Sequence, residues 1–228
     1  LAYYVLKLNN PTNFLTSAKY ADECLILHKW LQIALLKRIF GGTPDSVLRP
    51  IRKAIQDNPG NYPYKGIQEA LQGTTKSMKF DLPELEALLD YRYDQPYTFS
   101  ALTFLYPWLK YDQQFHVDHI FPKSKFNSKE LSKHNIPSDK WHLWLDNYNN
   151  IANLQLLQGP VNIAKSDQYF DSWLANECKT EEQLTQYKHN HYIPNCSLKF
   201  EDFPTFLEER EKLIKTQLAK ELNVKREA

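Results

Sequence analysis

Residues 115–122 read FHVDHIFP and place an aspartate and a histidine side by side, Asp118 and His119, inside an apolar stretch. A neutral histidine can remove a proton from water, because its pKa lies near working pH. A carboxylate can bind a hard divalent cation such as Mg²⁺, which prefers oxygen ligands. An acid and an imidazole at this spacing are therefore residue types that phosphodiester hydrolysis can use.

Two asparagines further along the chain extend this candidate site. Asn153 lies in the segment NIANLQLL, and Asn162 lies in the segment that follows it. Asn162 offers an amide oxygen as a second metal ligand. Because neighbouring strand residues point to opposite faces, Asp118 and His119 cannot both face one atom. They can serve one phosphate if the metal lies on one side and the attacking water on the other.

Each of these four residues also has a structural interpretation when it is taken alone. Asp118 could form a turn, His119 could be a satisfied buried side chain, Asn153 could bond the loop backbone, and Asn162 could cap a helix. Their combination on one unit favours a catalytic site.

The elements that must position these residues follow in the order strand, long loop, strand, helix. Residues 115–121 have strand-like spacing. A polar segment spans about 123–150, and residues 150–157 are a second strand candidate. Gly159 and Pro160 then open a predicted helix that runs through residue 177.

The rest of the chain is predicted to be helical, with helical spacing of apolar residues. The predicted helices span residues 19–40, 45–55, 65–72, 82–93, 97–109, 181–190 and 201–223. The last of them is a long, charged, amphipathic helix, which we interpret as a solvated packing helix.

The net charge and the cysteines limit the class of protein. The formal net charge is +1, so any nucleic-acid surface must be a local patch. Such a patch is predicted in the loop after Pro122, where Lys123 and Lys125 lead a run of lysines. Three cysteines without a CxxC pair argue against a disulfide framework or a four-cysteine zinc site, and indicate a reducing cytoplasm.

The ends and the hydropathy of the chain carry two further expectations. No apolar run reaches the length that spans a bilayer, so we expect no membrane segment. The chain lacks an initiator methionine, and its one Met is Met78. We therefore expect it to be a piece of a longer protein.

The motif FHVDHIFPKSKF, followed by NIANLQLLQGPVNIAKSD, resembles HNH (ββα-metal) nucleases, including the HNH domain of RNA-guided CRISPR nucleases. With ALLKRIFGG and ALTFLYPWLKY, these segments resemble the C-terminal half of GmrSD-like type IV restriction proteins over roughly residues 30–175. Those proteins pair a ParB-related, nucleotide-hydrolysing N-terminal domain with a C-terminal HNH nuclease.

The resemblance implies a role for each motif residue. His119 is the general base, and Asp118 and Asn162 bind a divalent metal, Mg²⁺ or Mn²⁺. Asn153 orients the histidine or braces the loop, and Lys165 lies near the phosphate. His116 receives no role, because related motifs often have an acid there.

The expected fold is mainly α with a small ββα-metal (HNH) unit embedded among helices. We expect a helical region over residues 1–110, the nuclease unit over 111–177 and a second helical region over 178–228. The expected function is metal-dependent cleavage of DNA, modified phage DNA included, in anti-phage restriction, with a nucleotide-hydrolysing N-terminal domain as partner. Two alternatives stay open, a nucleic-acid-binding module whose nuclease has decayed and a helical protein-interaction scaffold.

Overall fold

A computed structural model describes residues 1–42, 44–109 and 113–224 of the chain. The chain divides into two compact units, Leu1–Lys79 and Phe80–Ala228. The boundary expected between residues 110 and 111 lies outside the described residues.

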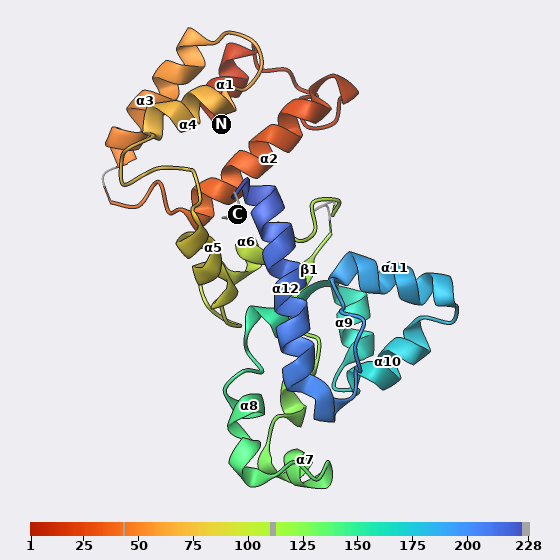
Figure 1. Cartoon of the computed structure of the whole chain (residues 1–228). Helices are drawn as coiled ribbons and strands as arrows, with labels where there is room; N and C mark the ends of the chain where they lie inside the picture. Colours follow the sequence, from red (N-terminus) through yellow and green to blue (C-terminus); the bar gives the residue numbers. More distant parts are fainter. Residues whose placement is uncertain (43, 110–112, 225–228) are drawn as a thin grey trace. The chain divides into compact units, whose positions relative to one another are not determined.

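The first unit is helical. Its long helix α2 contributes Leu27, Trp30 and Ile33 to a buried core. Apolar residues recur at helical spacing in α3, which packs against α4. The helices are α1 (Ala2–Lys7), α2 (Ala21–Leu36), α3 (Pro44–Asp57) and α4 (Tyr64–Leu71), with a 3₁₀ turn at Ala18–Tyr20 (Figure 1).

The second unit combines helices with an antiparallel sheet of two strands, β1 and β2. The prediction of a mainly α fold with a small sheet is thereby confirmed. The elements are α5 (Leu82–Leu89), α6 (Thr98–Thr103), β1 (Phe115–His119), α7 (Ser128–Lys133), α8 (His142–Leu145), β2 (Leu154–Gln158), α9 (Gly159–Lys165), α10 (Phe170–Glu177), α11 (Glu181–His191) and α12 (Phe203–Leu222). Short 3₁₀ turns lie at Lys123–Lys125, Ser138–Lys140, Ile151–Asn153 and Phe200–Asp202.

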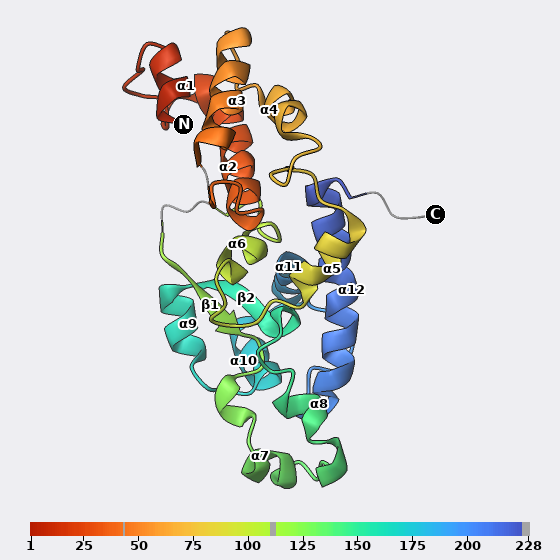
Figure 2. The same ribbon diagram turned by 90° about the vertical axis from the view of Figure 1, so that its left-hand side faces the viewer.

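Helix α12 packs against several elements of the second unit. It contacts α5, α8 and the 3₁₀ turn at Ile151–Asn153, and it lies along one edge of the unit in the view of Figure 2. Phe203, Phe206 and Ile214 on its inner face are fully buried. The sequence predicted the position of this helix, but its interpretation as a solvated helix is wrong for the inner face, which is buried and packs on the turn before β2.

Several predicted elements differ from the structure in their bounds: the helix predicted over 19–40 ends at Leu36, that over 82–93 ends at Leu89, and the first strand ends at His119. The helix predicted over 97–109 ends at Thr103, four residues before Pro107, and a proline restricts the residue before it. The second strand begins at Leu154, because Ile151–Asn153 form a 3₁₀ turn. The helix predicted through residue 177 is two helices, since Ser166 adopts φ 47° and ends α9.

Across the described ranges, no helix is both long enough and apolar enough to cross a membrane. Cys24, Cys178 and Cys196 are free thiols.

Candidate active site

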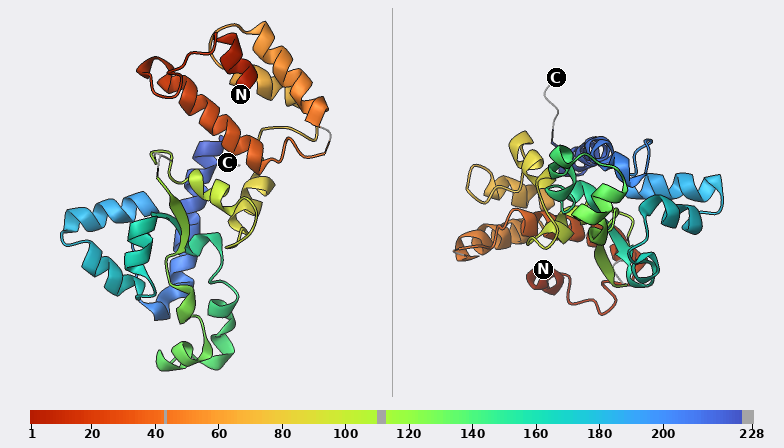
Figure 3. Two further views of the ribbon diagram at one scale, coloured as in Figure 1. Left: turned by 180° about the vertical axis from the view of Figure 1, so that it is seen from behind. Right: turned by 90° about the horizontal axis from the view of Figure 1, so that it is seen from below.

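The two strands and α9 bring the motif residues together. In the antiparallel register Asp118 lies opposite Gln155 and His119 opposite Leu154. Helix α9 follows β2 directly and contacts both strands, and it lies beside β1 in the opposite views of Figures 1 and 3. Alternation along β1 gives His119 the face opposite to that of Asp118.

The carboxylate of Asp118 is almost completely buried and is bonded on both oxygens. Lys165 Nζ lies 3.0 Å from Oδ2 and 3.2 Å from Oδ1. Gln155, the cross-strand neighbour, donates its amide to Oδ2 at 2.9 Å. Tyr187 on α11 in turn donates its hydroxyl to the Gln155 amide oxygen at 2.8 Å. Bonds from α9 and β2, the second of them supported by Tyr187 on α11, therefore fix the carboxylate.

Lys165 lies in the interior, with a side chain that is 0% exposed. Its ammonium also donates to the main-chain carbonyl of His119. Burial lowers the pKa of Lys165, and the charge of Asp118 opposes that shift. The sequence interpretation put this lysine next to a phosphate, whereas in this structure its ammonium is turned inward onto Asp118.

His119 is held from the other side of the strand. Its Nε2 lies 2.9 Å from the Asn149 amide oxygen, and its ring lies 4.4 Å, centroid to centroid, from that of Tyr93. Because an amide oxygen only accepts, Nε2 carries the hydrogen and Nδ1 keeps its lone pair. Burial lowers the pKa of His119, and the bond to Asn149 and the charge of Asp118 oppose the shift. The imidazole is therefore neutral near pH 7, as a general base requires.

Asn153 is a fully buried brace between the loop and the end of β1. Its amide oxygen accepts from the Phe121 N–H at 2.9 Å, and its amide nitrogen donates to the Phe121 carbonyl at 3.1 Å and the Tyr148 carbonyl at 2.8 Å. Its main-chain carbonyl accepts from Ile120 at 2.7 Å. These contacts fix the backbone on the C-terminal side of His119.

Asn162 lies on α9, three residues before Lys165, and is partly buried. Residues three apart lie on the same side of a helix, and Lys165 is the one whose side chain reaches β1. His116 also lies against this helix, because a Cβ built on Gly159 would be 3.5 Å from its Nε2.

Arg210 on α12 secures the loop that carries Asn149 and Asn153. Its side chain is 0% exposed, and its guanidinium donates to the carbonyls of Ala152 at 2.7 Å and His191 at 3.1 Å. Burial lowers the pKa of Arg210 to about 10. Sequence reasoning missed Arg210 and Tyr187 because they lie outside the motif, and it missed Gln155, which lies inside NIANLQLL, because its role depends on the strand register that sets it opposite Asp118. It also missed Asn149, for which the run NYNNIAN was an available signal.

The two predicted DNA-contacting lysines differ in their surroundings. Lys123 is exposed, and its charge is close enough to contribute to the lowered pKa of His119. Lys125 is only partly exposed, pairs with Asp167 at 3.5 Å and lies 4.8 Å from the Tyr169 ring centre. Lys123 is therefore the freer of the two to reach a phosphate.

The donor chemistry around Asp118 fits a hard cation. The carboxylate and the His119 carbonyl already surround a positive charge, and Asn162, three residues before Lys165 on α9, carries an amide oxygen of the kind such a cation takes. Within the described residues, no three His, Cys, Asp or Glu side chains gather as a metal site. Mg²⁺ does not need such a cage, because it usually takes one or two protein ligands and fills the remainder with water and phosphate.

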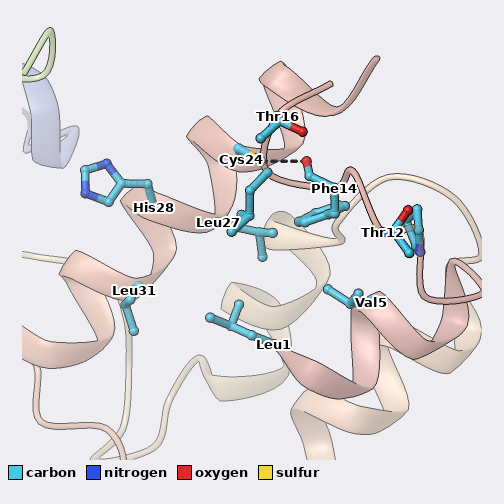
Figure 4. Close-up of a pocket in the computed structure, with 11 residues that line it drawn as sticks. Leu1, Val5, Thr12, Phe14, Thr16, Cys24, Leu27, His28 and Leu31 are labelled. Atoms are coloured by element: carbon cyan, nitrogen blue, oxygen red, sulfur yellow. Dashed lines mark hydrogen bonds between the residues drawn. The ribbon is translucent and has the colours of Figure 1, made fainter. Parts of the chain in front are cut away.

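A pocket in the first unit offers no comparable chemistry. It has a volume of about 630 Å³, and its walls are mainly aliphatic, with Leu1, Val5, Leu27 and Leu31 (Figure 4). The Cys24 thiol near it donates to the Phe14 carbonyl at 3.6 Å. We therefore centre the site on β1, β2 and α9.

Comparison with known proteins gives one family. The model of the family described as "GmrSD restriction endonucleases, C-terminal domain" matches residues 65–221. A search of curated proteins finds no match.

Proposed function

This chain belongs to the family of GmrSD restriction endonuclease C-terminal domains, and from that membership we propose that it is a metal-dependent HNH nuclease that hydrolyses DNA phosphodiester bonds. The family makes it a restriction endonuclease domain. The proposal adds the HNH mechanism, the metal and the roles of individual residues.

The observation that carries the proposal is the hydrogen bond from His119 to Asn149 on one face of β1, with a cation-binding carboxylate on the other. A strand that presents a base and an anion on opposite faces can serve two sides of one phosphate. His119 removes the proton of the attacking water through Nδ1, while Asn149 keeps the ring in the required tautomer.

Asp118 and Asn162 are the residues that we propose to hold a divalent metal, Mg²⁺ or Mn²⁺. When bound, such an ion neutralises the charge that develops on the phosphate and on the leaving oxygen. Gln155 and Tyr187 keep the Asp118 carboxylate in place, and Asn153 with Arg210 keeps the loop against the end of β1.

DNA is the proposed substrate, with Lys123 and Lys125 as backbone contacts. Lysines near the phosphate backbone position the duplex without reading its sequence. A nucleotide-hydrolysing N-terminal domain, which the resemblance implies, is proposed as the partner, and the cell interior as the place of action.

A nuclease assay on supercoiled plasmid tests the proposal directly. The full chain is incubated with unmodified and base-modified plasmid in Mg²⁺, Mn²⁺, Ca²⁺ or EDTA. We expect nicked or linear product in Mg²⁺ or Mn²⁺ and none in EDTA. Binding of DNA without product in every metal would instead indicate a decayed, DNA-binding module, and cleavage at an undiminished rate in EDTA would contradict metal dependence.

A further inference from the structure

The ammonium group of Lys165 lies at the oxygen cluster of Asp118 and the His119 carbonyl, where a metal cation would bind. The Lys165 side chain is 0% exposed, and its ammonium bonds Asp118 Oδ2 at 3.0 Å, Asp118 Oδ1 at 3.2 Å and the His119 carbonyl at 2.5 Å. An ammonium has three N–H donors, and three oxygen acceptors surround this one. The buried charge of Asp118 is therefore already neutralised within the chain.

A divalent metal would use the same oxygens. Carboxylate and carbonyl oxygens are the ligands that hard cations take. Two positive charges cannot share that position, because at such a separation in a poorly solvated interior their repulsion is large. A metal that binds Asp118 at this position must therefore move the ammonium away.

The backbone next to Lys165 has a feature that fits such a movement. Lys165 is the last residue of α9, and Ser166 directly after it has φ 47° and ψ −129°. A residue other than glycine in this region is strained, and such strain persists only where the surrounding contacts hold it. The next residues, 166–168, are exposed to solvent. Release of Lys165 would free the strained residue and let the ammonium reach water.

We propose that Lys165 is a resident counter-cation that holds Asp118 in the metal-free protein and is displaced into solvent when a divalent ion binds. The inference rests on the metal role proposed above for Asp118. Metal binding then includes the cost of breaking a buried ion pair, so the lysine weakens the intrinsic metal affinity of the site. The released ammonium becomes available to a DNA phosphate, which couples metal binding to DNA binding.

Chemical labelling of the unmodified protein tests the displacement without any mutation. Lysines are acylated briefly in EDTA and in saturating Mn²⁺, and the modified peptides are quantified by mass spectrometry. We expect labelling of Lys165 to rise several-fold in Mn²⁺, while the exposed Lys123 labels equally in both conditions. Equal protection of Lys165 in both conditions would overturn the inference.

Calorimetric titration of Mn²⁺ into a Lys165→Gln variant gives an independent test. Glutamine keeps a hydrogen-bond donor for Asp118 but removes the competing charge, so we expect a Kd about tenfold tighter than that of the parent chain. An unchanged or weaker affinity would overturn the inference. Thermal unfolding followed by circular dichroism confirms that the variant is folded.

Adding Asp118→Asn to the Lys165→Gln variant separates this inference from the proposed function. If Lys165→Gln does not tighten Mn²⁺ binding but the added Asp118→Asn substitution abolishes it, only the counter-cation role is wrong. If Mn²⁺ binds as tightly after Asp118→Asn as before it, Asp118 is not a metal ligand, and both the metal assignment and this inference fail.

Discussion

His119 and Asn149 are joined by a 2.9 Å hydrogen bond although 30 residues separate them in the chain. The bond links the end of β1 to the loop before β2, and it determines which nitrogen of the imidazole carries the hydrogen. The proposed base therefore depends on a loop that is itself held by Asn153 and by Arg210 from α12.

Removal of the Asn149 amide should slow cleavage with little effect on substrate binding. In Asn149→Ala the imidazole loses the acceptor that fixes its tautomer, and one hydrogen bond of this kind corresponds to about a tenfold change in rate. We expect kcat to fall and KM to stay nearly constant in steady-state plasmid cleavage. Asn147→Ala, which removes an amide that donates to the Leu143 carbonyl one turn earlier, is the matched control and should leave kcat unchanged.

Substitution of Asn153 should act on stability. Asn153→Ala leaves the Phe121 N–H and two carbonyls in the interior without their partner, at a cost of about 1–3 kcal/mol for each unsatisfied group, part of which relaxation recovers. We expect urea denaturation to show a free energy of unfolding lower by about 3 kcal/mol. A loss below that of the Asn147→Ala control would show that the brace is not needed.

The sequence predicted this site through its local patterns and missed what depends on tertiary contacts. Apolar and β-branched residues in FHVDHIF predicted β1 because such residues pack well on a pleated sheet. The inward direction of Lys165 could not be predicted, because a lysine in the last turn of a helix is usually exposed. The strand register sets Asp118 opposite Gln155 and next to α9, and this placement gives Lys165 a buried partner for its charge.

The same reasoning explains the errors in element bounds. The spacing of apolar residues through 177 is compatible with one helix, yet the chain breaks at Ser166, where Lys165 is drawn onto Asp118. Long-range contacts also explain why α12 is a buried helix. Its charged Arg210 can lie in the interior because carbonyls of Ala152 and His191, from two other segments, accept its hydrogen bonds. The acceptors for that guanidinium are backbone groups, which carry no signal in the sequence.

Arg210 should be among the most sensitive positions outside the motif. Arg210→Met keeps much of the volume but leaves the carbonyls of Ala152 and His191 without their donor in the interior. We expect a loss of about 3 kcal/mol in the free energy of unfolding, because each unsatisfied buried carbonyl costs about 1–3 kcal/mol. The control Lys212→Met removes a mostly exposed charge on the same helix and should change stability by less than about 0.5 kcal/mol. Equal effects of the two substitutions would contradict the role given to Arg210.

His191 should make the protein less stable as the pH falls. Burial lowers its pKa to about 3 from the ordinary 6.5, and the charge of Arg210 adds to the shift. Below pH 6.5 the imidazole of His191 therefore binds a proton in the unfolded chain but stays neutral in the folded chain. Stability is fully present above pH 6.5 and is lost progressively toward pH 3.

Urea titrations of the parent chain and of His191→Gln at several pH values measure this contribution. By linkage, His191 should account for a loss of about 2 kcal/mol between neutral pH and about pH 5. The variant should show a correspondingly flatter dependence, whereas His142→Gln, which changes an exposed histidine, should follow the parent. A variant as pH-sensitive as the parent would show that His191 is not the responsible group.

Plasmid cleavage by His119→Ala, compared with His142→Ala, tests the central claim most directly. Both substitutions remove a histidine, but His142 is exposed on α8, where its Nδ1 lies 2.9 Å from the carbonyl of Asp139. The claim predicts that His119→Ala lowers the cleavage rate in Mg²⁺ or Mn²⁺ by about 10²–10⁴-fold at a temperature where circular dichroism shows the variant folded, and that His142→Ala cleaves like the parent. Cleavage by a folded His119→Ala protein at the parent rate would contradict it.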